Sequence, residues 1–408
     1  MKMRVRLSWV TSTALIAMAI ATPGRAQQDT TKRVRDSLAA DSAALVRELT
    51  AASARPAGGA GPSNARLLPD ISAVGDLLAD FSKNGSTQEG GQRFSVREVE
   101  LAILAAVDPY FRGEIYLGFN DEEGVGVEQA FIVTSSLPWG LEARAGRFLM
   151  PFGKQNLTHR HDLHTIDYPW VLQRFLGAEG LKGTGVSVSK VVAPFGFYQE
   201  LQLTAVDQFG EAEEGLETEE PVNKRLGNLG YAARFRNYVD LTKHANLEIS
   251  ASVVTGKRAQ PAVGLLVGNA IPVRQSLVGL DVTYRWRPLQ QGLYRSFILQ
   301  GELIRQFNEK ISDSGYLGPV GNHTGGYLFG RYQLTRRGYL GARYDWLQDP
   351  DAGGERFNAG SGYLEFFPSE FSKLLLGFER VSPVGEPAYG RILFQATFAL
   401  GPHKPHPF

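Results

Sequence analysis

The stretch Arg391-Ile-Leu-Phe-Gln-Ala-Thr-Phe-Ala-Leu400 decides the fold class, because apolar and polar side chains alternate along it. One face carries Ile392, Phe394, Ala396, Phe398 and Leu400, and the opposite face carries Arg391, Gln395 and Thr397. A period of two residues is that of a β-strand with one apolar and one polar face. The same alternation recurs from Leu67 to Leu400, for example over 111–119 and 280–287. The sequence therefore predicts an all-β domain over 67–401.

The connections between these strands also alternate, in length. Tight links are expected at 108–109, 137–140, 194–196, 242–245, 288–292, 336–338 and 368–370. Mostly longer, polar links lie near 82–93, 120–124, 154–182, 209–226, 257–275, 308–323, 348–356 and 382–388. Short turns at one end and longer loops at the other are typical of outer-membrane barrels. The pattern predicts a transmembrane antiparallel β-barrel of about 16 strands, within a range of 14–18, in the outer membrane of a Gram-negative-type bacterium. A large soluble β-sandwich is the alternative.

Composition narrows the class further. The 408 residues include no Cys, which excludes a disulfide scaffold, a thiolate metal site and a cysteine nucleophile. After the N-terminal segment no apolar run reaches about 18 residues, the length that a membrane-spanning helix needs. A strand of a membrane barrel needs only about 9–11 residues, so the moderate hydrophobic content of 43% is compatible with one.

The first 26 residues predict a secretory signal, with basic residues, an apolar run from Leu7 to Ala21 and small residues before Gln27. Removing 1–26 takes away four basic residues and no acidic ones, so 43 basic residues become 39 against 42 acidic. That balance does not indicate a nucleic-acid partner. Residues 27–66 are expected to form a short amphipathic periplasmic helix, at 30–53, and a flexible linker. Residues 402–408, with three prolines, are expected to form a solvated tail.

If the larger apolar residues face lipid, the opposite face of each strand lines the lumen. The predicted lining comprises Glu98, Glu100, Arg112, Glu114, Arg144, Arg234, Arg236, Asp281, Arg285, Arg287, Glu302, Arg331, Arg343, Asp345, Glu379 and Arg391. Basic groups at this density would each cost about 2–4 kcal/mol at the centre of the bilayer, but they can line water. Two interpretations stay open: the arginines form a path for anions, or they pair with wall carboxylates and stiffen the barrel. Aromatic residues near the presumed strand ends, including Trp139, Phe195, Tyr339 and Phe367, are expected to form interfacial girdles.

The link at 154–182 is the candidate constriction, since so long a connection in a compact domain is usually functional. It contains His159, His161, Asp162, His164 and Asp167. The three histidines predict either a polar, pH-responsive lining or a zinc site formed by His159, His161 and His164. Residues 175–181 are expected to anchor this loop against the wall. A hydrolase is the third alternative, although no G-x-S-x-G motif occurs.

Four segments carry a resemblance to a known family: 107–117, 140–153, 175–181 and 185–189. Together they resemble the outer-membrane porins related to the phosphate-selective porins O and P, and in particular a branch described as porin-like or zinc-regulated outer-membrane proteins. The resemblance implies a sixteen-stranded barrel, a homotrimer, an inward third loop and passive diffusion of small solutes. This chain is poor in lysine, unlike the phosphate-selective members with their lysine cluster. We therefore expect a porin for small charged solutes, with outer-membrane lipid as its surroundings and no catalytic activity, and with a zinc-binding or zinc-uptake protein as the alternative.

Overall fold

The computed structural model describes residues 68–88, 90–120, 124–177, 179–207, 225–261, 270–308 and 321–401. The chain divides into 1–63 and 64–408, and the described residues all belong to the second unit. The expected signal, the expected helix and linker at 27–66 and the expected tail at 402–408 lie outside the described residues. No helix in the described part of the chain has the length and apolar character needed to cross a bilayer.

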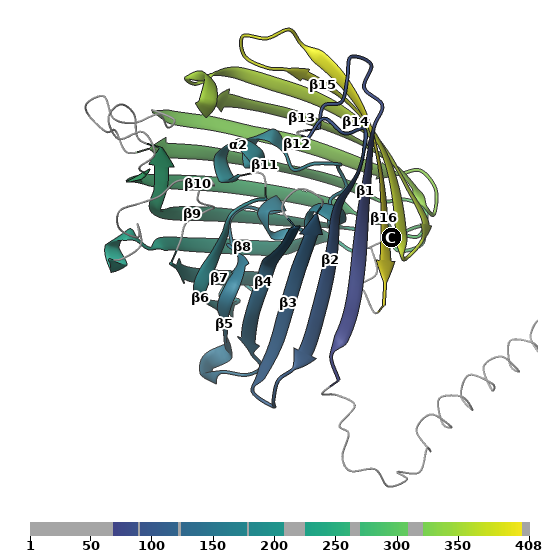
Figure 1. The fold of residues 1–408 in the computed structure, drawn as a ribbon. Helices are drawn as coiled ribbons and strands as arrows, with labels where there is room; N and C mark the ends of the chain where they lie inside the picture. The colour runs from purple at the N-terminus through teal and green to yellow at the C-terminus, as the bar shows by residue number, and fades with distance from the viewer. Residues whose placement is uncertain are drawn as a thin grey trace, which may run out of the picture. The chain divides into compact units, whose positions relative to one another are not determined.

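The described residues form sixteen strands. They are β1 (Asp70–Asp80), β2 (Phe94–Ala106), β3 (Phe111–Asn120), β4 (Gly124–Thr134), β5 (Leu141–Leu149), β6 (Lys182–Val192), β7 (Tyr198–Val206), β8 (Gly230–Thr242), β9 (Ala245–Pro261), β10 (Ala270–Trp286), β11 (Phe297–Asn308), β12 (Asn322–Gln333), β13 (Gly338–Asp349), β14 (Glu355–Ser369), β15 (Ser372–Ser382) and β16 (Tyr389–Leu400). Each strand pairs antiparallel with its sequence neighbours, and β1 pairs with β16 to close the ring. The predicted sixteen-stranded antiparallel barrel is confirmed (Figure 1).

The connections alternate between the two ends of the barrel. Seven of them, each following an even-numbered strand from β2 to β14, are turns of 2 to 10 residues. The eight that follow odd-numbered strands lie at the other end and include the longest one, at 150–181. We call these the turn end and the loop end. The link after β10 covers 287–296 and is longer than expected, whereas the link after β3 covers only 121–123.

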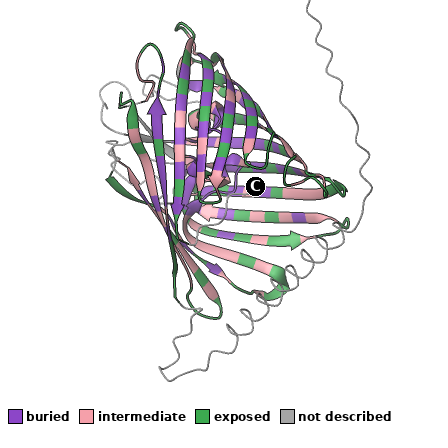
Figure 2. Ribbon diagram, turned by 90° about the vertical axis from the view of Figure 1, so that its right-hand side faces the viewer, coloured by how far each residue is buried: buried purple, intermediate pink, exposed green. Residues whose placement is uncertain are grey.

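Burial follows the two-residue period along the strands, as the bands of colour in Figure 2 show. On β13, Leu340 and Tyr344 are exposed, while Arg343 and Asp345 are almost fully buried. Because the charged residues of such strands point inward and most of the exposed residues are apolar, the outer surface suits lipid and part of the interior is polar. Two aromatics expected in the girdles, Tyr339 and Phe367, instead point inward and are buried, since they fall on the inward parity of their strands.

The connection at 150–181 lies inside the ring of strands, where Figure 1 shows its helix α2 (Trp170–Leu176). Its apolar residues form one continuous core with inward-facing wall residues such as Leu277, Ile304 and Leu347. The barrel interior is therefore partly filled by a packed apolar core, and this core holds the loop in place.

Candidate functional site

The inward loop combines short 3₁₀ turns with one helix. The turns are η3 (Gln155–Leu157) and η4 (Arg160–Asp162). In α2, Val171, Leu172, Phe175 and Leu176 are buried, and their spacing places them on one face of a helix. The apolar anchor thus begins at Trp170, several residues before the expected 175–181. The apolar pairs one helical turn apart were the signal that could have predicted α2.

Three inward-facing glycines of the wall receive apolar side chains of the loop. A Cβ atom on Gly279 would lie 2.9 Å from Phe152 Cζ, and one on Gly377 would lie 2.6 Å from Ile166 Cδ1. On Gly325 it would lie 2.8 Å from Val171 Cγ2. Such distances are too short for real Cβ atoms, so the loop packs against β10, β12 and β15 only because these positions have no side chain.

Polar contacts fix the same loop to the wall. Lys154 Nζ donates to Glu248 at 3.0 Å, and the backbone N–H of Gln155 donates to Glu302 at 2.7 Å. Trp170 donates through its backbone N–H to Asp345 at 3.0 Å and through Nε1 to Glu379 at 3.1 Å. These wall groups belong to β9, β11, β13 and β15. The predicted lining residues Glu302, Asp345 and Glu379 therefore hold the loop.

Most of the predicted arginines pair with carboxylates. Arg343 lies 2.7 Å from Asp345, and Arg331 lies 2.5 Å from Glu365. The other pairs are Arg391 with Glu379 and Asp167, Arg236 and Arg285 with Glu248, Arg234 with Asp281 at 3.8 Å, and Arg112 with Glu114 and Glu142. These contacts favour the second interpretation of the arginines, in which they pair with wall carboxylates.

Two predicted arginines behave differently. The guanidinium group of Arg144 lies over the Phe131 ring, 4.6 Å from its centroid, and 5.6 Å from that of Phe148. Arg287 lies just beyond the end of β10, is exposed and donates to the carbonyl of Gly292. Arg287 therefore stands at the turn-end mouth, outside the strands.

Two of the cavities beside the loop lie next to its histidines. The larger one, about 580 Å³, opens on the turn-end side, and its lining includes Glu100, Glu114, Glu142, Arg144, Asp162, Glu200, Arg234 and Arg236. The smaller one, about 50 Å³, lies toward the loop end, and its lining includes Arg97, Glu98, Glu128, Arg160, Glu179 and Lys182. Gln129, Leu149 and His159 line both. His159, a residue of the loop, therefore stands at the junction of the two cavities and faces the wall formed by β2–β5.

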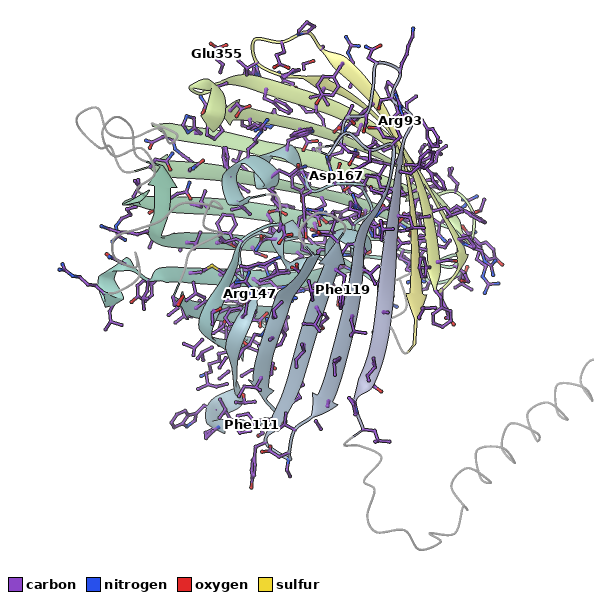
Figure 3. All side chains as sticks on the ribbon, viewed as in Figure 1. Arg93, Phe111, Phe119, Arg147, Asp167 and Glu355 are labelled. Carbon is purple, nitrogen blue, oxygen red and sulfur yellow. The ribbon has the colours of Figure 1, made fainter. Side chains whose placement is uncertain are left out.

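The five expected constriction residues separate into two groups. His159, His161 and Asp162 line the larger cavity. His164 lies elsewhere, with Nδ1 at 3.2 Å from Glu365 Oε1. Asp167, labelled in Figure 3, is ion-paired with Arg97 at 3.0 Å and Arg391 at 3.1 Å.

The expected grouping of His159, His161 and His164 is not formed. Among the described residues, Glu100, His159 and His161 offer ligand atoms that all lie within 4.8 Å of one another. His159 Nδ1 lies 2.7 Å from Glu100 Oε2. A wall carboxylate thus takes the place that the sequence pattern gave to His164, because Glu365 holds His164 on another part of the wall.

The loop groups titrate in different directions. Burial by itself lowers the pKa of His159, but the hydrogen bond and charge of Glu100 outweigh it, so the pKa is raised. Burial lowers the pKa of His161 and, together with Arg331, that of His164. Burial opposes ionisation of Asp167, yet the charges of Arg391 and Arg97 keep its pKa below the usual range.

Sequence reasoning missed several residues of this site. Glu248, Glu365 and Lys373 share the inward parity of their strands, so strict alternation could have found them. Arg97 could not be found this way, because the register between β1 and β2 shifts next to Asp76. This irregularity allows Arg97 to reach Asp76 while Glu98 lines the smaller cavity.

A closed sixteen-stranded barrel with an apolar outside, a charged inside and an inward loop is an outer-membrane β-barrel with the porin fold. Solved structures agree at the level of the fold. OprB of Pseudomonas putida gives a TM-score of 0.54 at 9% identity, covering 81% of this chain and 94% of its own. The anion-selective porin from Comamonas acidovorans gives 0.53 at 11% identity, covering 82% and 99%. The trimer form of OmpT from Vibrio cholerae gives 0.52 at 9% identity, covering 81% and 99%.

No protein-family model matches the chain. An uncharacterized protein of Aquifex aeolicus (strain VF5) is 31% identical over 394 residues, and the match covers 85% of this chain and 81% of that protein. The chain therefore belongs to the same family as the Aquifex protein.

Proposed function

We propose that this protein is an outer-membrane porin through which small charged solutes diffuse passively, along a path narrowed by residues 154–182. The observation that carries the proposal is the division of the interior. The loop packs against Gly279, Gly325 and Gly377 on one side, while a chamber lined by charged residues remains on the other. A channel needs both a stable wall and a polar path, and this division supplies them.

The path runs along β2–β5 and passes His159, which lines both cavities. In the larger cavity five carboxylates, from Glu100, Glu114, Glu142, Asp162 and Glu200, face three guanidinium groups. We therefore propose a modest preference for cations. The relation to the phosphate-selective porins stays a prediction from the sequence, and this carboxylate majority favours a solute other than phosphate.

Conductance of the purified protein in planar bilayers tests the proposal. Discrete current steps are expected, and the reversal potential across a salt gradient should have the sign of cation preference. The triple variant Glu100→Gln, Glu114→Gln, Glu142→Gln should lower that preference. Glu355→Gln is the matched control, because Glu355 is exposed at the loop-end start of β14 (Figure 3). A folded, heat-modifiable barrel that gives no current steps would reject the porin.

The proposal includes the parts of the chain outside the barrel. We propose cleavage of residues 1–26, a periplasmic segment at 27–66 and assembly as a homotrimer, the form named for the OmpT structure. Sequencing of the mature N-terminus should give Gln27, and cross-linking in detergent should stop at three copies.

A hydrolase finds less support than a porin. Each of the three loop histidines lies beside a carboxylate: His159 beside Glu100, His161 beside Asp162 and His164 beside Glu365. These contacts suit ion passage or cation binding, and we propose no catalytic activity.

A further inference from the structure

We propose that Glu100, His159 and His161 bind a divalent transition-metal ion at the junction of the two cavities. The three residues come from β2, from the residue before η4 and from η4 itself, so the folded loop is what brings them together. Their ligand atoms lie within 4.8 Å of one another. Two imidazoles and one carboxylate suit Zn²⁺, Co²⁺ or Ni²⁺ better than Mg²⁺ or Ca²⁺, which prefer oxygen ligands alone.

Binding an ion would change the distances between the ligand atoms, which now lie within 4.8 Å of one another. Two ligands that each lie about 2.0–2.1 Å from a tetrahedral ion are about 3.3 Å apart. His159 Nδ1 and Glu100 Oε2 now lie 2.7 Å apart, so the ion would replace the proton between them and widen the gap slightly. Glu100 and His161 are 3% and 2% exposed, which limits their freedom to move away.

The fourth coordination position faces the larger cavity, because all three ligand residues line it. Asp162, whose Oδ1 lies 3.8 Å from His161 Nε2, supplies a further carboxylate beside this opening. Three protein ligands with one open position are characteristic of a site that exchanges water or solute, whereas structural zinc sites are closed by four. The bound ion would therefore exchange through the cavity.

Gln129 is the positioning residue of this site. Its Nε2 lies 2.9 Å from His159 Nε2, while its Oε1 accepts a hydrogen bond from the Leu149 N–H at 3.1 Å. A metal ion on Nδ1 leaves a proton on Nε2, which then needs an acceptor. The amide of Gln129 must turn over to provide one, so a carboxylate at this position should hold the metal-bound imidazole better.

A bound ion at the junction would add positive charge where the path is narrow. It should therefore reduce cation conductance, and this consequence rests on the proposed porin function. Metal binding itself does not depend on conduction, so the two can be tested apart.

Isothermal titration calorimetry of the purified, folded barrel with Zn²⁺ tests binding, with Mg²⁺ as the control ion. We expect one Zn²⁺ per chain and no comparable heat from Mg²⁺. His159→Asn, His161→Asn and Glu100→Gln should each weaken binding by more than about tenfold, because even the loss of a residue that only orients a ligand usually costs about 10–100-fold. His164→Asn is the matched control from the same loop and should bind as the parent does. Gln129→Glu should tighten binding. This variant keeps all three ligands, so its result does not depend on whether the three ligand variants fold.

The visible absorption of the Co²⁺-loaded protein gives a second readout, which should change in Gln129→Glu and stay unchanged in His164→Asn. Equal Zn²⁺ affinity in the parent and in folded His159→Asn or His161→Asn would overturn the site, as would weaker binding in Gln129→Glu. Current steps that do not change when Zn²⁺ is added, together with no calorimetric binding, would overturn the metal site and leave the proposed porin function standing. Zn²⁺ binding in a barrel without current steps would support the site and reject the porin.

Discussion

Lys373 of β15 is a charged residue that is only 1% exposed, and its partners explain why it can be buried. Its Nζ donates to the backbone carbonyls of His161 and Leu163, at 2.5 and 2.7 Å. Both carbonyls belong to the loop, next to the residues that line the larger cavity. One wall cation thus fixes the segment that carries His161.

Lys373→Met should destabilise the barrel and loosen the loop. It removes two hydrogen bonds from a charged donor and leaves two buried carbonyls without it, a loss of about 2–5 kcal/mol. Urea unfolding followed by tryptophan fluorescence measures this. Lys190→Met is the control, because Lys190 is exposed. A midpoint for Lys373→Met equal to that of the control would contradict the anchoring role.

His159 should make ion selectivity depend on pH. Its pKa is raised, against the effect of burial, by Glu100 and Asp162, so it gains its proton above the ordinary value of about 6.5. Acidification from pH 8 to pH 5 adds a positive charge at the junction and should lower cation preference, with a midpoint above about 6.5. Reversal potentials in the presence of a chelator measure this. His159→Asn should reduce the change and His164→Asn should retain it; a midpoint below 6.5 in the parent would speak against the assignment.

At the scale of elements, the loop fits against the wall because its apolar side chains lie where the wall has glycine. Gly279, Gly325 and Gly377 lie on three different strands, and each leaves room for one apolar loop side chain. These contacts between a loop side chain and a wall glycine hold the loop against the wall together with the buried face of α2. The width of the path therefore depends on positions in the wall that carry no side chain.

Gly377→Val should push the loop away from β15 toward the chamber and lower single-channel conductance. Its Cβ would lie 2.6 Å from Ile166 Cδ1, and the barrel itself tolerates valine well in a strand. Gly360→Val is the control, since a Cβ there meets nothing within 4 Å. Planar-bilayer recordings of both variants compare the step sizes. If Gly377→Val and Gly360→Val conduct equally, the loop does not narrow the path.

The strands were predictable from sequence, whereas the contacts between loop and wall were not. Alternation along a strand is a local property, so the inward parity of Arg343 or Glu302 follows from neighbouring residues. Which wall residue meets which loop residue depends on closure of the ring. For this reason the sequence placed His164 with the other histidines, while Glu365, 201 residues away, holds it elsewhere. The shift that turns Arg97 inward also breaks the local rule.

At the scale of the whole molecule, the apolar outer surface sets where a charge is tolerated. Leu280, in the middle of β10, is 48% exposed on this surface. Leu280→Arg should cost about 2–4 kcal/mol of folding free energy in lipid, because a basic group would face the bilayer centre. Leu289→Arg, in the turn-end connection, is the control. Folding yield into lipid vesicles compares the two, and equal yields would mean that β10 does not face lipid.

The anchoring of the loop also affects the order of events during assembly. Its partners come late in the chain: Trp170 meets Glu379 across 209 residues, and Lys373 meets His161 across 212. Until β15 is in place, the wall against which the loop's apolar side chains pack is incomplete, and contacts this distant in sequence form slowly. During assembly the loop is therefore an exposed segment with unpacked apolar side chains, which proteases can cleave and chaperones can bind. Its protection from cleavage would mark the moment at which the ring closes.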